Sequence, residues 1–167
     1  MKKTLGALLV VLLVLGCDGF VGEVRIDKPR GAPVAIADAD YLILRPVSTA
    51  PGPGLTAATV HGQTVYYNPT TRIMDLRHLD PRTAKVDEGR AGTHVVPIET
   101  TPEGDRLLGT WTSANLEKQL GVFLDGRLIS APHIRTKITG MIVVEDELTK
   151  DRAEAILARL QRGGAAD

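Results

Sequence analysis

Apolar residues fall at every second position of residues 120–124, and this period of two predicts a strand with one face in a core. Asp125-Gly126 follows, a pair that readily adopts the positive φ values of a two-residue hairpin turn. The chain then returns through residues 128–129 and stops at Pro132, which lacks the donor needed for strand pairing. Residues 120–132 are therefore predicted to form a β-hairpin.

Two helices are predicted from apolar residues spaced three or four apart. The first begins with Thr101 as its cap and Pro102 in its first turn, and Gly104 and Gly109 are expected to weaken it. Its apolar face is Leu107, Leu108, Trp111 and Ala114, with Trp111 as the core anchor. The second helix follows the capping Thr149, and its stripe is Ala153, Ile156, Leu157 and Leu160.

The remaining elements are mainly strands. Strands are expected at residues 40–46, 64–69, 93–99 and 141–145, a loop at 47–54 and a short helix from Leu76 to Pro81. Pro46 is expected to end its strand, Pro97 to lie at a bulge or an outward-facing edge, and Glu145-Asp146-Glu147 to form a solvated loop. This order predicts an α+β fold, a mostly antiparallel sheet with helices packed on one face.

The N-terminus has the pattern of a cleaved signal. Lys2 and Lys3 precede the apolar stretch 5–15, which is shorter than the ~20 residues that span a bilayer. Gly16-Cys17 ends this stretch with the one cysteine of the chain, which resembles a bacterial lipobox with Cys17 as the lipidated mature N-terminus. The alternative is an ordinary secretory signal with an incidental thiol. Residues 1–16 are thus expected to be a signal peptide, and 17–38 a flexible tether.

Charge and composition exclude some classes of function. The 20 basic and 20 acidic side chains balance, and no basic tract clusters on one element, so nucleic acid is not an expected partner. Four widely spaced histidines (His61, His78, His94 and His133) lack metal-ligand spacing, so no metal or other cofactor is expected. Ser130 has no nucleophile-elbow context, and backbone geometry explains Asp125. No catalytic residues are expected, and the chain is interpreted as a non-enzyme.

The hairpin region resembles a known family. Asp125-Gly126, Ser130-Ala131-Pro132, Ile134, Ile138, Gly140, Ile142, Thr149, Ala153, Leu160 and Gly163 are similar to the signature of SecD, a subunit of the SecDF protein-export complex. The signature belongs to the head subdomain of SecD's first periplasmic domain. The likeness is clearest over residues 95–164, within a domain expected at 39–164 and followed by a tail at 165–167.

The resemblance implies a SecD-head-like, ferredoxin-like fold and a protein partner. Together with the lipid anchor expected at Cys17, it implies a lipoprotein at the cell membrane, facing the periplasm or the cell exterior, that binds translocating or unfolded polypeptide or subunits of the export machinery. The alternative is a structural or envelope-assembly lipoprotein that uses the domain for another protein contact. The expected contact residues lie at the hairpin: Asp125, Gly126, Arg127, Ser130, Ala131, Pro132 and Arg135. Arg127, Arg135 and Lys137 form either a solvated basic rim or an electrostatic contact with the partner.

Overall fold

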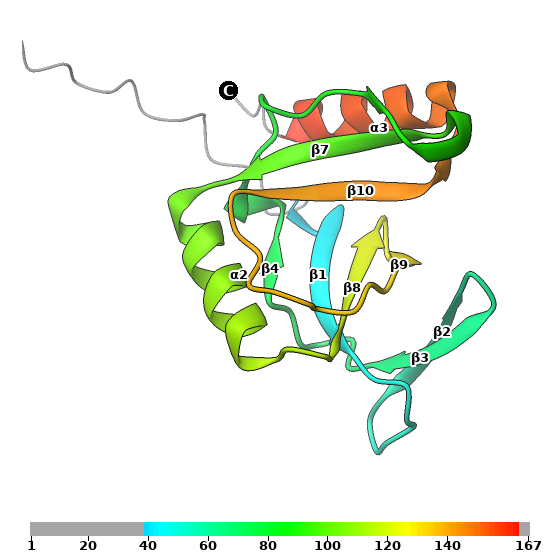
Figure 1. Ribbon diagram of the computed structural model, residues 1–167, viewed down its shortest axis with the longest axis vertical. Helices are drawn as coiled ribbons and strands as arrows, with labels where there is room; N and C mark the ends of the chain where they lie inside the picture. The colour runs from blue at the N-terminus through cyan, green and yellow to red at the C-terminus, as the bar shows by residue number, and fades with distance from the viewer. Residues whose placement is uncertain (1–38, 164–167) are drawn as a thin grey trace, which may run out of the picture.

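A computed structural model describes residues 39–163, which form two antiparallel sheets, a separate two-stranded hairpin and two α-helices (Figure 1). The first sheet has the order β4-β1-β8-β9, with β4 (Met74–Asp75), β1 (Leu42–Val47), β8 (Gln119–Leu124) and β9 (Arg127–Ser130). The second has the order β10-β7-β5, with β10 (Met141–Leu148), β7 (His94–Thr100) and β5 (Leu79–Asp80), and β6 (Asp87–Glu88) also pairs with β7. The remaining elements are β2 (Thr56–Val60), β3 (Gln63–Tyr67), the 3-10 turns η1 (Leu76–His78) and η2 (Arg90–Gly92), α2 (Pro102–Ala114) and α3 (Lys150–Gly163).

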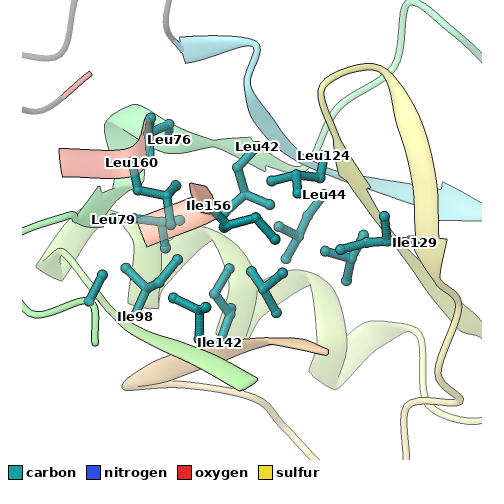
Figure 2. Close-up of a cluster of buried hydrophobic side chains, with 14 of the residues drawn as sticks. Leu42, Leu44, Leu76, Leu79, Ile98, Leu124, Ile129, Ile142, Ile156 and Leu160 are labelled. Atoms are coloured by element: carbon teal, nitrogen blue, oxygen red, sulfur yellow. The ribbon is translucent and has the colours of Figure 1, made fainter. Parts of the chain in front are cut away.

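The predicted α+β class and the antiparallel pairing are confirmed. The strands divide between two sheets, however, and β10 belongs to a different sheet from the β8–β9 hairpin. The apolar faces of both sheets meet α2 and α3 in one large core (Figure 2). Leu44 and Leu124 enter this core from the first sheet, Ile98 and Ile142 from the second, and Ile156 from α3.

Strand β8 is buried on both faces, so the prediction that only one of its faces lies in a core was wrong. All six residues of β8 are buried. Val122 and its alternate neighbours join the large core, whereas Phe123 on the opposite face packs with Ile43, Val47 and Val65 in a second cluster. The sequence alternation was partial because Phe123 is itself apolar.

The β2–β3 hairpin covers this second cluster. Strand β3 was predicted, but β2 and the pairing were missed. The turn is His61-Gly62, whose φ values of 47° and 75° are those of a two-residue hairpin turn of the same kind as Asp125-Gly126. Tyr67 of β3 places its ring centroid 4.6 Å from that of Phe123. The hairpin therefore seals the face of the first sheet that the helices leave uncovered.

Two prolines lie inside strands rather than at their ends or bulges. Pro46 does not end β1, which continues to Val47, and Pro97 lies in β7, a strand with partners on both sides. Thr100 N–H donates to Gly140 O, so the main chain of Thr100 bonds to β10. Residues that bond to the partner strand alternate with residues that point away from it, so the nitrogen of Pro97, three positions earlier, points away from β10. It faces the gap between β5, which pairs as far as Glu99, and β6, which pairs from Val95. Pro97 therefore takes no donor from either pairing and needs no bulge.

Helix α2 begins as predicted, but its buried face differs from the prediction. Thr101 caps it by accepting a hydrogen bond from Gly104 N–H at 3.1 Å. The buried positions are Gly104, Leu108, Gly109 and Thr112, whereas Trp111 is only partly buried and Ala114 is exposed. Leu108, at 0% exposure, is therefore the anchor expected of Trp111.

Gly104 of α2 serves close packing. A Cβ on Gly104 would lie 2.2 Å from the backbone oxygen of His78 in η1. That oxygen already accepts a hydrogen bond from Thr101 N–H at 2.9 Å. The absence of a side chain at Gly104 therefore lets α2 begin directly against η1.

Helix α3 follows the prediction closely. Thr149 accepts at its side-chain oxygen from Arg152 N–H, and Ala153, Ile156 and Leu160 are buried. The preceding acidic run was predicted incorrectly as a loop. Glu145-Asp146-Glu147 belongs to β10, which runs to Leu148 with an irregular register over its last residues. Glu147 has φ of 44°, and this local bend lets the strand continue to α3.

A buried carboxylate ties β4 to η1. Asp75 is 1% exposed, and its side chain accepts from Arg77 Nη2 at 2.7 Å and from the Arg77 backbone N–H at 3.1 Å. Arg72 lies 3.4 Å from the same carboxylate and 2.6 Å from that of Asp40. Burial would raise the pKa of Asp75, but the hydrogen bonds from Arg77 and the charges of His78 and Arg77 outweigh it, and the pKa lies below its ordinary value.

Candidate protein-contact site

The β8–β9 turn has the predicted geometry. Leu124 pairs with Arg127, so Asp125 and Gly126 form the whole turn, with φ of 50° and 74°. Asp125 N–H donates to Tyr41 O at 2.8 Å, which fixes the turn against the start of the domain. The backbone of Asp125 therefore has a structural role, and its side chain is exposed.

Substitutions at this turn should separate a structural role from a chemical one. Gly126→Val is expected to lower the free energy of unfolding by ~1–3 kcal/mol, because a β-branched residue resists positive φ. Asp125→Asn should leave the melting temperature nearly unchanged, because asparagine accepts the same turn geometry. Thermal melts of the two variants measure this. Loss of partner binding in a stable Asp125→Asn protein would instead show that the carboxylate contacts the partner.

Ser130, Ala131 and Pro132 line an open groove of about 520 Å³ at the end of this hairpin. Its other walls come from the tip of β2–β3, from η2 with the start of β7, and from the acidic end of β10. The wall residues outside the hairpin are Val60, His61, Gln63, Arg90, Ala91, Thr93, His94, Val95, Glu145, Asp146 and Glu147. Four segments distant in the sequence thus meet where the family-like Ser-Ala-Pro motif ends.

A contact between His61 and Asp146 joins two walls of this groove. His61 Nε2 lies 3.6 Å from Asp146 Oδ1, which brings the tip of β2–β3 to the bend in β10. Both side chains are well exposed, at 53% and 39%. Exposed pairs of this kind are worth about 0–1 kcal/mol, so the contact positions the hairpin tip without locking it.

The other predicted contact residues lie around the groove rather than in it. Arg127 lines a neighbouring groove of about 380 Å³ with Leu148 and Arg152, and this groove shares Asp146 and Glu147 with the first. Asp125 and Gly126 border a third hollow, beside Tyr41, Arg45 and Arg159. Arg135 is 2.8 Å from Glu117, and both side chains are exposed. The seven expected residues are therefore divided among three hollows and one surface ion pair, and their role as a contact surface stays a prediction.

The entry to β10 is held by Asp105 of α2. This carboxylate accepts from Thr100 Oγ1 and, at 2.6 Å, from Gly140 N–H. The Thr100 hydrogen bond, followed by that from Gly140, lowers the pKa of Asp105 from its ordinary value. One side chain thus links α2, the end of β7 and the start of β10.

The site offers no obvious metal-binding set. Within residues 39–163, no three His, Cys, Asp or Glu side chains are grouped so that they could hold a metal ion. His61 and His94 both line the groove, and His61 Nε2 lies 3.6 Å from Asp146 Oδ1. The same part of the chain contains no helix with the length and apolar character needed to cross a membrane. Cys17 and residues 1–38 and 164–167 lie outside the described residues, as do the signal, tether and tail predictions.

Sequence reasoning missed much of the groove. His61 and Gln63 were not expected there because the β2–β3 hairpin had not been identified. His61-Gly62 between Thr56–Val60 and Gln63–Tyr67 was the available signal, since a glycine-containing pair between two short β-rich runs favours a tight turn. Arg90 and Ala91 carry no comparable signal, because η2 is an irregular turn in which Ala91 has φ of 54°.

Both sequence and fold are similar to known export proteins. The family model for the SecDF P1 head subdomain matches residues 55–166. Protein translocase subunit SecD of Dictyoglomus turgidum is 40% identical over 85 residues, which are 50% of this chain and 21% of that protein. Protein translocase subunit SecDF of Thermus thermophilus is 35% identical over 74 residues, which are 44% of this chain and 10% of that protein. The chain thus matches about a fifth or less of the length of these relatives.

Two solved structures share the fold. A structure of SecDF, a membrane component that enhances protein export, aligns with a TM-score of 0.54 and 21% identity over 74% of this chain and 62% of that one. SecDF in its super-membrane-facing form aligns with a TM-score of 0.54 and 22% identity, over 78% of this chain and 21% of that one. At these identities the structures support the fold, while the match of the family model rests on the sequence.

Proposed function

The chain belongs to the SecDF P1 head family, and on this premise we propose that it acts in protein export as a membrane-anchored, non-enzymatic lipoprotein that binds translocating or unfolded polypeptide. The observation that supports this role most directly is the open groove at Ser130-Ala131-Pro132, where the family-like motif meets three other segments. A partner that entered this groove from solvent would contact main-chain groups, apolar side chains and charged side chains. Subunits of the export machinery are the second kind of protein that this surface could contact.

The non-enzymatic part of the proposal is supported by the roles of the polar residues at the hairpin. The backbone of Asp125 forms a turn, Arg135 pairs with Glu117, and Ser130 lies opposite Val122 in the β8–β9 pairing. These side chains are not arranged as nucleophile, base and orienting group.

Crosslinking in living cells tests the proposed partner. A photoreactive amino acid is placed at Gln63, Ala91 or Glu145, three exposed positions of the groove, and at Ser113 on the exposed side of α2 as the matched control. We expect groove positions, but not Ser113, to capture a secretory protein arrested during export. Capture of a single envelope protein instead, with no arrested chain, would favour the envelope-assembly alternative and overturn the export role.

Membrane anchoring is tested separately at Cys17. Cys17→Ser should leave the precursor unprocessed or release the protein from the membrane fraction, because the thiol is the site of lipid attachment. Fractionation and metabolic labelling with a radioactive fatty acid measure the two effects. Normal processing with unchanged membrane association would show that the cysteine does not carry the anchor.

A further inference from the structure

Strand β10 is the edge of its sheet. In the described part of the chain it pairs with β7 and has no strand on its other side. Its outer face carries Met141 at 48% exposure and Val143 at 37%, two of the three exposed large hydrophobic residues of residues 39–163. Edge strands in folded proteins are commonly protected by proline, lysine or a covering element. The first half of β10 has no proline or lysine in Met141–Glu145.

The register shows which main-chain groups face outward. Thr100 N–H donates to Gly140 O, and the pairing continues with Ile142 opposite Ile98 and Val144 opposite Val96. In an antiparallel pair the residues alternate between those that bond to the partner strand and those that point away from it. Ile142 and Val144 therefore bond to β7, whereas the N–H and C=O groups of Met141, Val143 and Glu145 point to the open edge.

The side chains along this edge change from apolar to acidic. Met141 and Val143 are followed by Glu145, which is exposed and also lines the groove. A strand lying antiparallel to β10 would place its side chains directly opposite these three. It would be complementary with a basic residue opposite Glu145 and apolar residues opposite Val143 and Met141.

We propose that the edge of β10 over Met141–Glu145 binds an extended polypeptide by strand addition, and that it prefers a segment in which a basic residue is followed by alternate apolar residues. Main-chain hydrogen bonds supply binding that tolerates many sequences, and the three side chains supply the preference. Binding by strand addition goes beyond the proposed function. It rests on that function in one respect, which is that the ligand is an unfolded segment of polypeptide. The groove, which shares Glu145, continues the surface toward Ser130-Ala131-Pro132.

The test uses the synthetic peptide Thr-Lys-Thr-Val-Thr-Val-Thr and two N-methylated forms of it. Methylation of both valine nitrogens removes donors that would face β10, whereas methylation of the two threonine nitrogens on either side of the first valine leaves those donors intact. Fluorescence anisotropy should show that the valine-methylated form binds at least tenfold more weakly than the unmethylated peptide, whereas the threonine-methylated form binds as the unmethylated peptide does. Equal affinities of the two methylated forms would overturn strand addition.

Hydrogen exchange on the unaltered protein gives a second readout. The peptide should slow exchange of the Met141, Val143 and Glu145 amides, while Ile142 and Val144 should already be protected by β7. Glu145→Lys should reverse the preference, so that a peptide with glutamate in place of lysine binds more tightly than the original. Unchanged exchange at all three outward amides would contradict the proposal.

These outcomes are distinguishable from failure of the proposed function. Crosslinking of exported chains in cells, together with equal binding of the methylated peptides, would retain the export role and remove strand addition. Peptide binding at β10 without capture of exported chains would retain the edge site and remove the export role.

Discussion

Replacing Gly104 with alanine should lower the free energy of unfolding by ~2–3 kcal/mol, although alanine is the better helix former. The new Cβ would lie 2.2 Å from the backbone oxygen of His78 and 3.2 Å from its carbonyl carbon. This oxygen belongs to η1 and accepts a hydrogen bond from Thr101 N–H, so it cannot move away without losing the start of α2. Denaturant unfolding at neutral pH measures the change.

Gly109→Ala is the matched control in the same helix. It gains the same ~1 kcal/mol of helix propensity, and its Cβ would meet Lys137 Cε at 2.8 Å and Thr139 Cγ2 at 2.9 Å. Both contacts are with the ends of side chains that can rotate, so we expect a change within about 1 kcal/mol of zero. Equal losses in the two variants would show that the packing of η1 against α2 is not the cause.

Asp75→Asn should be the second strongly destabilising substitution, with a loss of ~2 kcal/mol at pH 7. The asparagine fits the same space but cannot accept charge-assisted hydrogen bonds at both oxygens from Arg77 and Arg72. The loss stays below that of a fully buried ion pair because both arginines are substantially exposed, at 47% and 38%. Asp87→Asn is the control, since its pair with Lys85 is exposed and should contribute under about 1 kcal/mol.

The loss of stability caused by Asp75→Asn should be present at neutral pH and should disappear in acid. The pKa of Asp75 is lowered in the folded protein from its ordinary value of 3.8, so the stabilisation is present above pH 3.8 and disappears as pH falls through the folded pKa. The unfolding curves of the parent and the variant should therefore differ at pH 7 and converge in acid. A constant difference between pH 7 and pH 2 would show that the loss is one of packing rather than of charge.

Local sequence patterns predicted those elements whose geometry is determined locally. The β8–β9 turn and the caps of α2 and α3 depend on a few neighbouring residues, and each formed where Asp125-Gly126, Thr101 and Thr149 placed it. The role of Gly104 could not be predicted in this way. Its constraint comes from His78, 26 positions earlier in the chain, and the intrinsic propensity of glycine suggested only a weaker helix.

The sequence predicted no groove, and only the residues of its hairpin side were expected to contact a partner. Ser130-Ala131-Pro132 was identified through family resemblance, whereas the opposite wall depends on how β2–β3 folds against β8 and β10. Strand β2 has mostly exposed residues, so its alternation between apolar and polar positions is weak. Its position depends on packing beneath β3, where Val65 is buried, and on contact of the His61 turn with Asp146.

The two faces of the first sheet are covered separately, one by the helices and the other by the β2–β3 hairpin. Among the described residues, the large core contains twenty buried apolar residues, whereas the cluster beneath β2–β3 contains four. Lifting this hairpin therefore exposes far less apolar surface than global unfolding and requires less free energy. Such a partial opening would expose Phe123 and remove one wall of the groove while the large core stays buried.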